Sequence, residues 1–191
     1  MSNRIFVALD ISGEAREKIA GFIKGFKAEF RHLRVGWEKL EKMHLTLKFL
    51  GDIGEEQLAD LTEAVKRTAA VSGPFLVNVE KTGCFPSPKK ARILWLGLTD
   101  ASVNLQKLQE KLEEEAGARG FVKENRSFKP HLTIARLREP EKSRELADKF
   151  LQTQFEPVSF EVSEILIYES KLQPAGSVYS VLSKKKLGQE Q

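Results

Sequence analysis

Cysteine, histidine and long apolar runs are scarce in this chain of 191 residues. Its one cysteine, Cys84, cannot form an intramolecular disulfide, and a chain without a disulfide framework is typical of a reducing compartment. No stretch approaches the roughly 20 apolar residues that a membrane-spanning helix needs, and the short apolar run near the start lacks a secretory cleavage site. We therefore expect a cytoplasmic protein with no membrane partner.

The composition is that of an ordinary globular protein, with 41% hydrophobic and 30% charged residues. Its length allows one sizeable core, so we expect a single domain over residues 1–191. Lys and Arg number 31 against 27 acidic residues, a net charge of +4. This balance permits a nucleic-acid or phosphate partner without establishing one, because a solvated surface explains most such charges.

Hydrophobic periodicity and turn residues predict a mixture of helices and strands. Helices are expected at residues 14–30, 55–71, 101–118 and 141–151. Strands are expected at residues 4–10, 33–37, 43–50, 75–83, 92–98, 130–137, 158–168 and 177–182. The lysine-rich end, residues 184–191, is expected to be a flexible tail.

The order of these elements indicates an internal duplication. Two β-α-β-α-β units, at approximately residues 1–90 and 91–183, repeat the same succession. Matched residues lie 88, 87 and 85 positions apart, counting Ile5 to Ile93, His44 to His131 and Phe75 to Phe160. Two such units usually pack about a pseudo-two-fold axis, which would place equivalent residues on opposite walls of one cleft.

Two of the three histidines lie in the same four-residue pattern at equivalent points of the two units. The first is His44-Leu45-Thr46-Leu47 and the second is His131-Leu132-Thr133-Ile134. Residues i and i+2 of a strand share one face, so each histidine projects together with its threonine. We expect both pairs to face the same cleft, while the aliphatic residues between them enter the core.

Two histidines in one cleft suit acid–base chemistry on a phosphodiester. One imidazole can accept a proton while the other donates one, and threonine hydroxyls can hold the phosphate oxygens without a metal. A single strand histidine packed under a helix would be an ordinary structural feature, but the duplication argues against that interpretation. A zinc site using His44, His131 and Cys84 lacks the usual ligand spacing, and His32 fits a surface position near a helix end.

These motifs resemble the paired HxTx motifs of the 2H phosphoesterase superfamily, specifically its RNA 2',3'-cyclic phosphodiesterase branch, the bacterial and archaeal 2'-5' RNA ligase-like proteins. The resemblance covers nearly the whole chain. It includes His44-Leu-Thr-Leu-Lys-Phe-Leu-Gly, Phe128-Lys-Pro-His-Leu-Thr-Ile-Ala-Arg, the opening Arg4-Ile-Phe-Val-Ala-Leu, Trp37 and the closing Tyr168-Glu-Ser-Lys-Leu.

The resemblance implies a bilobed α+β fold, with antiparallel sheets lining a central cleft and helices outside. It also implies hydrolysis of RNA or nucleotide 2',3'-cyclic phosphates to 2'-phosphates, without cofactor or metal. In that scheme His44 resembles the proton donor and His131 the proton acceptor, while Thr46 and Thr133 bind the phosphate. We expect a monomer.

Three further residues are candidates for substrate binding. Lys48 shares the face of His44 by period two and could add positive charge near the phosphate. Arg136 belongs to the family-like motif but falls on the opposite face of a regular strand, so it would either reach substrate beyond a bulge or brace the core. Phe49 could stack on a base. Two other functions stay open at this point: a 2'-5' ligase that joins tRNA halves in a reverse-type reaction, and a non-catalytic module that binds RNA ends.

Overall fold

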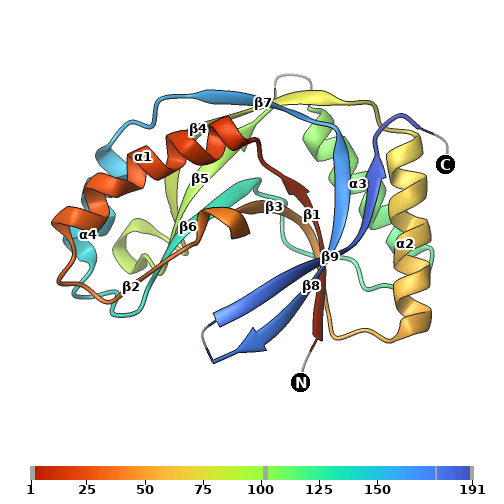
Figure 1. The fold of residues 1–191 in the computed structure, drawn as a ribbon, viewed down its shortest axis with the longest axis horizontal. Coiled ribbons are helices and arrows are strands. Elements are labelled where there is room, and N and C mark those ends of the chain that lie inside the picture. The colour runs from red at the N-terminus through yellow and green to blue at the C-terminus, as the bar shows by residue number, and fades with distance from the viewer. Residues whose placement is uncertain (1–2, 101–102, 175, 190–191) are drawn as a thin grey trace.

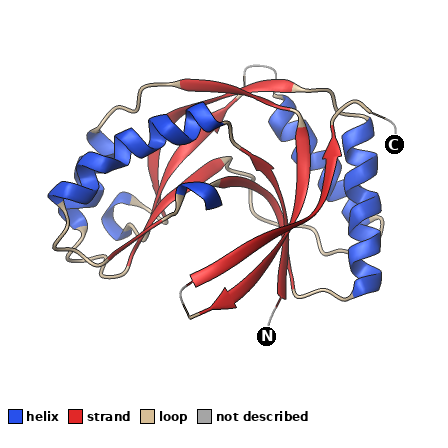
Figure 2. Ribbon diagram, viewed as in Figure 1, coloured by secondary structure: helices blue, strands red, loops and turns tan. Residues whose placement is uncertain are grey.

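Two antiparallel sheets make up the centre of the computed structural model, and helices cover their outer sides (Figure 2). The structure describes residues 3–100, 103–174 and 176–189. The helices are α1 (Gly13–Glu29), α2 (Glu55–Ala70), α3 (Asn104–Gly117) and α4 (Arg144–Gln152), with short 3₁₀ turns η1 (Leu40–Lys42) and η2 (Pro88–Lys90). The strands are β1 (Asn3–Asp10), β2 (Val35–Trp37), β3 (His44–Gly51), β4 (Phe75–Phe85), β5 (Ile93–Thr99), β6 (His131–Leu137), β7 (Val158–Val162), β8 (Glu164–Gln173) and β9 (Gly176–Lys186).

The four-stranded sheet has the order β3-β1-β8-β9 and carries α2 and α3, whereas the five-stranded sheet has the order β2-β6-β5-β4-β7 and carries α1 and α4 (Figure 1). Each sheet contains strands from both halves of the sequence, since β1 pairs with β8 and β5 pairs with β4. The result is the bilobed α+β fold with antiparallel sheets that the family resemblance implies.

Helix α1 shows how the local sequence builds a lobe. The side chain of Ser12 accepts a hydrogen bond from the amide of Ala15 at 3.1 Å, which caps the first turn. Ile19, Ile23 and Phe26 then recur at spacings of three and four residues and are all buried. Each side chain of this size contributes about 1.5–3 kcal/mol when it leaves water, so this apolar stripe fixes α1 to its lobe.

The duplication is visible in strand register. Ala8 of β1 lies opposite Thr46, and Trp95 of β5 lies opposite Thr133. Both pairs of strands contain a register shift at the same point, between Val7 and Ala8 in one and between Leu94 and Trp95 in the other. These positions are 87 residues apart, like the two histidines.

The third repeat offset predicted from the sequence, Phe75 with Phe160, does not match equivalent strands. β4 and β7, which contain these residues, are hydrogen-bonded neighbours in one sheet. The place of β4 beside β5 corresponds instead to the place of β8 beside β1.

Two sequence-based expectations about the C-terminal region are wrong. A single strand was expected over residues 158–168, but the chain leaves the five-stranded sheet after Val162 and enters the four-stranded sheet at Glu164. The expected flexible tail is structured through residue 188, because β9 continues to Lys186 and Leu187 is buried. Of the helix expected at residues 101–118, positions 101–102 lie outside the described residues.

Among the described residues, no helix is long and apolar enough to span a membrane.

Candidate active site

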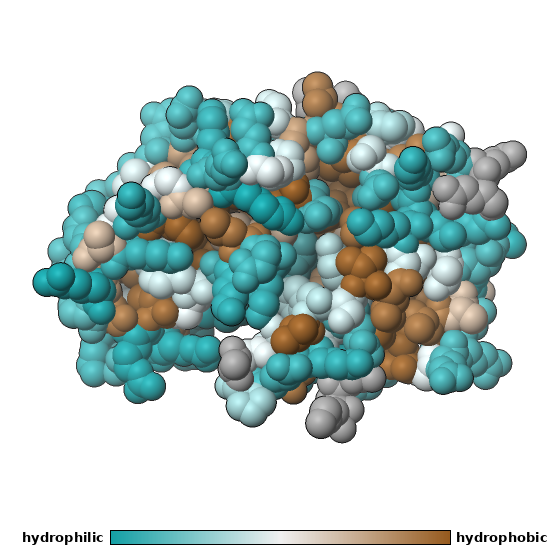
Figure 3. All heavy atoms as spheres, in the orientation of Figure 1, coloured by the Kyte–Doolittle hydropathy of each residue, from teal (hydrophilic) through white to brown (hydrophobic). Residues whose placement is uncertain are grey.

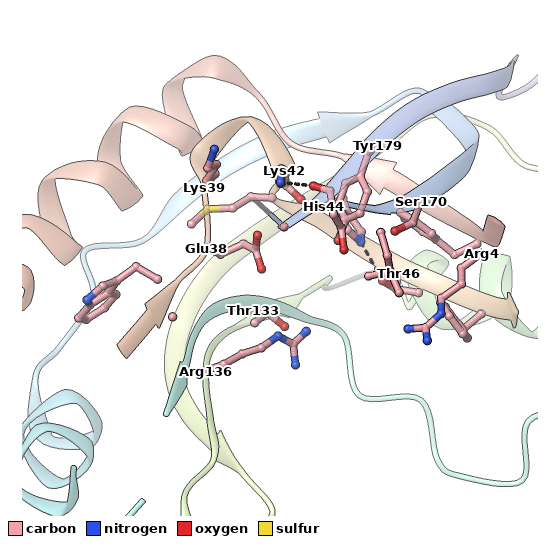
Figure 4. A pocket seen from close by; sticks show the side chains of 18 of the residues that line it. Arg4, Glu38, Lys39, Lys42, His44, Thr46, Thr133, Arg136, Ser170 and Tyr179 are labelled. Carbon is pink, nitrogen blue, oxygen red and sulfur yellow. Dashed lines mark hydrogen bonds between the residues drawn. The ribbon is translucent and has the colours of Figure 1, made fainter. Parts of the chain in front are cut away.

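Strands β3 and β6 carry the two His-x-Thr pairs to one cleft. His44, Thr46, His131 and Thr133 all line a cavity of about 790 Å³ between the two lobes. The space-filling view shows the molecule hollowed between its halves (Figure 3). In the close-up, His44 and Thr46 lie on one wall and Thr133 on the opposite wall (Figure 4). The structure therefore brings together the four residues that sequence reasoning paired.

Both imidazoles are oriented by the same backbone contact. The Nδ1 atom of His44 lies 2.7 Å from the carbonyl oxygen of Lys42, and Nδ1 of His131 lies 2.7 Å from the carbonyl oxygen of Lys129. A carbonyl oxygen only accepts hydrogen bonds, so Nδ1 carries the proton in each ring. Nε2 is then the atom available for proton transfer, and in His44 it lies 3.1 Å from the hydroxyl oxygen of Thr46.

A β-bulge follows each His-x-Thr pair and reverses which side chains face the cleft. Lys48 pairs with Val7 and Thr46 with the adjacent Ala8, so Leu47 is the extra residue in β3. Leu47 and Lys48 are consequently both buried, although a regular strand would alternate.

The residues beyond the two bulges return to the cleft side. Phe49 is 61% exposed and lines the cavity, and Arg136, at the matching position of β6, is exposed and also lines it. The bulges therefore bring both side chains to the cleft, and their role in substrate binding stays a prediction.

Lys48 is the exception, and its prediction as a substrate-binding residue is wrong. Its ammonium group points away from the cleft into a buried ion pair with Glu113 of α3, at 2.7 Å. It also donates to the carbonyl oxygen of Val122 at 2.8 Å. The bulge at Leu47 is the physical reason, because it shifts Lys48 to the core side of the strand.

Burial lowers the pKa of both catalytic candidates below the ordinary value for histidine. In each case the hydrogen bond to the backbone carbonyl opposes this effect, because it favours the protonated ring. The neighbouring charges differ: Asp10 raises the pKa of His44 while His131 and Arg16 lower it, and Arg136 lowers that of His131. The two rings are therefore similar in geometry and unlike in electrostatics.

Aromatic rings enclose His44. Phe6 stacks on it with centroids 4.7 Å apart, and Tyr179 meets it edge-on at 5.5 Å. Phe85 packs edge-on against His131 at 4.9 Å. These rings hold the imidazoles and supply the desolvation that lowers their pKa values.

Sequence reasoning missed several cleft residues. Arg4, Lys42, Arg138 and Tyr179 line the cavity, and the Lys42 ammonium lies 5.7 Å from the ring of Tyr179 while donating to the carbonyl oxygen of Ser177. These residues come from four separate segments that meet only in the fold, so their spacing in the sequence carries no signal.

The alternative zinc site finds no support in the geometry. Cys84 belongs to the apolar core, and burial raises the pKa of its thiol. Within the described ranges, no group of three or more His, Cys, Asp or Glu side chains is arranged to hold a metal ion.

Comparison with known proteins agrees with the family resemblance of the two His-x-Thr motifs. A family model described as the 2'-5' RNA ligase superfamily matches residues 16–173. The chain belongs to this superfamily. Among its superfamily relatives, the RNA 2',3'-cyclic phosphodiesterase of Methanothermobacter thermautotrophicus is 33% identical over 181 residues, covering 94% of this chain and 96% of that protein. The enzyme of the same name from Thermotoga maritima is also 33% identical, over 180 residues that cover 94% and 92% of the two chains.

Solved structures of other proteins share the fold. TT0787 of Thermus thermophilus superimposes with a TM-score of 0.77 at 27% identity, covering 98% of this chain and all of that one. LigT of E. coli in its apo form superimposes with a TM-score of 0.76 at 25% identity, covering 98% and 99%. The family resemblance seen in the HxTx motifs is thereby confirmed.

Proposed function

We propose that this protein hydrolyses RNA or nucleotide 2',3'-cyclic phosphates to 2'-phosphates, using His44 and His131 as a proton donor and a proton acceptor. The observation that carries the proposal is the cleft itself, which is lined by two His-x-Thr pairs whose imidazoles share one orientation. Relatives at 33% identity that are named RNA 2',3'-cyclic phosphodiesterase support the substrate class.

The proposed reaction needs one proton removed and one supplied. Nε2 of His131 takes a proton from water as the water oxygen bonds to phosphorus. The bond from phosphorus to the 3'-oxygen breaks, and Nε2 of protonated His44 gives its proton to that oxygen. The hydroxyls of Thr46 and Thr133 donate hydrogen bonds to the nonbridging phosphate oxygens and hold the group in line.

Two of the other predicted residues fit substrate binding in this scheme. Arg136 lines the cleft from the wall of His131 and can pair with a phosphate oxygen. Phe49 lines the cleft and is largely exposed, as a ring that stacks on a nucleobase should be. LigT of E. coli, 25% identical, has been crystallised with NADP+, which supports a cleft of nucleotide size.

The first prediction tests the two histidines. We expect His44→Ala and His131→Ala each to lower kcat on a 2',3'-cyclic nucleotide by about 10²- to 10⁴-fold, and the double variant to lose far less than the product of the two because the pair acts as a unit. His32→Ala is the matched control, since His32 is exposed and does not line the cleft.

The assay is run with EDTA, and the product is identified as a 2'- or a 3'-phosphate by phosphorus NMR. Activity retained in both alanine variants would contradict the two-histidine mechanism. Loss of wild-type activity in EDTA that added metal restores would contradict metal independence.

The superfamily name leaves a second candidate, the joining of a cyclic phosphate to a 5'-hydroxyl in a 2'-5' linkage. The same acid and base serve this reaction in reverse. Incubation of tRNA halves with the protein, followed by detection of the joined RNA, separates ligation from hydrolysis. Binding of a cyclic nucleotide without any product would instead indicate a non-catalytic module.

A further inference from the structure

The two histidines have unlike partners on the neighbouring strand, although their own strands match. Asp10 of β1 lies directly opposite His44, and Gly97 of β5 lies directly opposite His131. Asp10 and Gly97 are 87 residues apart, so they occupy equivalent positions of the duplication. The cross-strand position opposite His44 therefore carries a carboxylate, whereas the position opposite His131 carries no side chain.

The carboxylate of Asp10 is held in place from the first turn of α1. Its Oδ1 atom accepts a hydrogen bond from the amide of Ile11 at 3.0 Å and forms an ion pair with Arg16. The guanidinium of Arg16 also donates to the carbonyl oxygen of Ile11 at 3.0 Å and lies 3.5 Å from that of Met43, the residue before His44. Arg16 thus links the end of β1 to the start of β3.

The position of Asp10 favours a positive charge on His44. Residues directly opposite in an antiparallel pair share one face with Cβ atoms about 4.5–5.5 Å apart. A neighbouring carboxylate stabilises an imidazolium, and the charge of Asp10 raises the pKa of His44. The other titratable or charged groups near His44 are Arg16 of α1, Glu38 before η1, Lys42 of η1, Tyr168 of β8, Tyr179 of β9 and His131 of β6.

The aromatic neighbours do not compete with this role. Burial and the nearby charge of Asp10 raise the pKa of Tyr168 to about 12, so its ring is neutral beside His44. Burial likewise raises the pKa of Tyr179. Asp10 is accordingly the one anion directly opposite the ring in strand register.

His131 has the opposite bias. Gly97 offers no side chain, and the positive charge of Arg136 disfavours a proton on this ring. Burial lowers the pKa of both rings, and the charge of Arg16 also lowers that of His44, but Asp10 favours a proton on His44 whereas Arg136 disfavours one on His131.

We propose that Asp10, held by Arg16, is a positioning residue that places the shared proton on His44 and so makes His44 the donor and His131 the acceptor. This inference rests on the proposed hydrolysis of cyclic phosphates. The proton balance is that of the proposed reaction: His44 gives its proton to the 3'-oxygen, and His131 removes one from water.

Titration of the imidazoles by NMR tests the proposal without substrate. In Asp10→Asn we expect the pKa of His44 to fall by about half a unit to one unit while that of His131 stays constant. In Arg16→Gln, which leaves the carboxylate unneutralised, we expect the pKa of His44 to rise. The exposed His32 supplies an internal reference signal.

Opposite shifts separate an electrostatic role from a structural one. Loosening of the site would hydrate His44 and raise its pKa in either variant, whereas loss of the Asp10 charge lowers it. We expect Asp10→Asn to reduce turnover of a 2',3'-cyclic nucleotide by roughly 3- to 10-fold, since each pKa unit corresponds to a tenfold change in protonation. The alkaline limb of its pH–rate profile should move to lower pH. In Asp10→Glu, which keeps the carboxylate, the turnover and the position of the alkaline limb should both be close to those of the wild type.

Asp60→Asn, on the exposed side of α2, is the matched control and should change neither measurement. An unchanged or raised pKa of His44 in Asp10→Asn overturns the inference. If wild-type protein fails to hydrolyse any cyclic nucleotide while the NMR shifts occur as expected, the proposed function fails and the charge asymmetry stands.

Discussion

At the scale of single residues, Trp95 shows how closely the sheet beside His131 is packed. It lies between Gly83 of β4 and Thr133 of β6 in register, and its ring centroid is 6.2 Å from that of His131. A Cβ atom on Gly83 would come within 2.1 Å of the indole. The glycine is therefore required by the tryptophan, and the tryptophan in turn supports the wall that carries His131.

Substitution of Gly83 tests this packing. We expect Gly83→Ala to destabilise the protein by about 1–3 kcal/mol, the usual cost of overpacking a core. It should also lower turnover, because the displaced indole must move toward His131 and Thr133. Urea unfolding and a cyclic-nucleotide assay measure the two effects.

Gly25→Ala is the matched control for the glycine substitution. Gly25 is exposed in α1 and has no atom within 4 Å of an added Cβ, so alanine there should stabilise the helix by about 0.5–1 kcal/mol. Equal effects of the two substitutions on stability would contradict the packing role of Gly83.

At the scale of the elements, the bulges mark the limit of prediction from the sequence. Period two places His44 and Thr46 on one face, and the structure agrees. The same rule fails two residues later, because the extra residue Leu47 turns Lys48 inward and Phe49 outward. A bulge depends on the pairing with β1 and leaves no signature in β3 alone, so only the resemblance, and not periodicity, pointed to Arg136.

Because Lys48 points into the protein, its side chain stabilises the structure. Its ion pair with Glu113 is almost fully buried, with 4% and 12% of the two side chains exposed. Lys48 also binds the carbonyl oxygen of Val122, and Glu113 accepts from the amide of Glu124 at 3.2 Å. These contacts fasten the segment between α3 and β6, which leads to His131, onto strand β3.

Removal of the ammonium should release this segment. We expect Lys48→Met to cost about 3–5 kcal/mol in stability, because it leaves Glu113 buried without its partner. Trypsin should then cut faster after the exposed Arg126. The double variant Lys48→Met/Glu113→Gln should recover part of the loss, since it buries no unpaired charge; a purely additive double-mutant cycle would show that the pair is not coupled.

At the scale of the whole molecule, the two lobes are not the two repeats. The matched order of elements predicts the duplication, but each sheet combines strands from both halves, and the chain crosses from one sheet to the other at Ser163. A continuous apolar strand pattern hides such a crossing, which is why one strand was expected there. This interleaving affects the cleft, because each of its walls is a sheet built from both halves of the sequence. Movement of either wall therefore moves strands from both halves.

The pH dependence of stability is a property of both lobes together. Burial holds the pKa values of His44 and His131 below the ordinary value of about 6.5. As the pH falls below that value, the unfolded chain binds protons that the folded chain does not, so stability decreases. Each histidine can contribute up to about 1.4 kcal/mol per pH unit in that window.

We expect the wild type to lose more stability between about pH 7.5 and pH 5.5, by urea unfolding, than the variant His44→Gln/His131→Gln. Both proteins contain the same carboxylates, so the contribution of these carboxylates to the loss of stability cancels when the two proteins are compared. An identical loss in both would mean that the cleft hydrates these rings fully, and the physical basis for a poised acid and base would be gone.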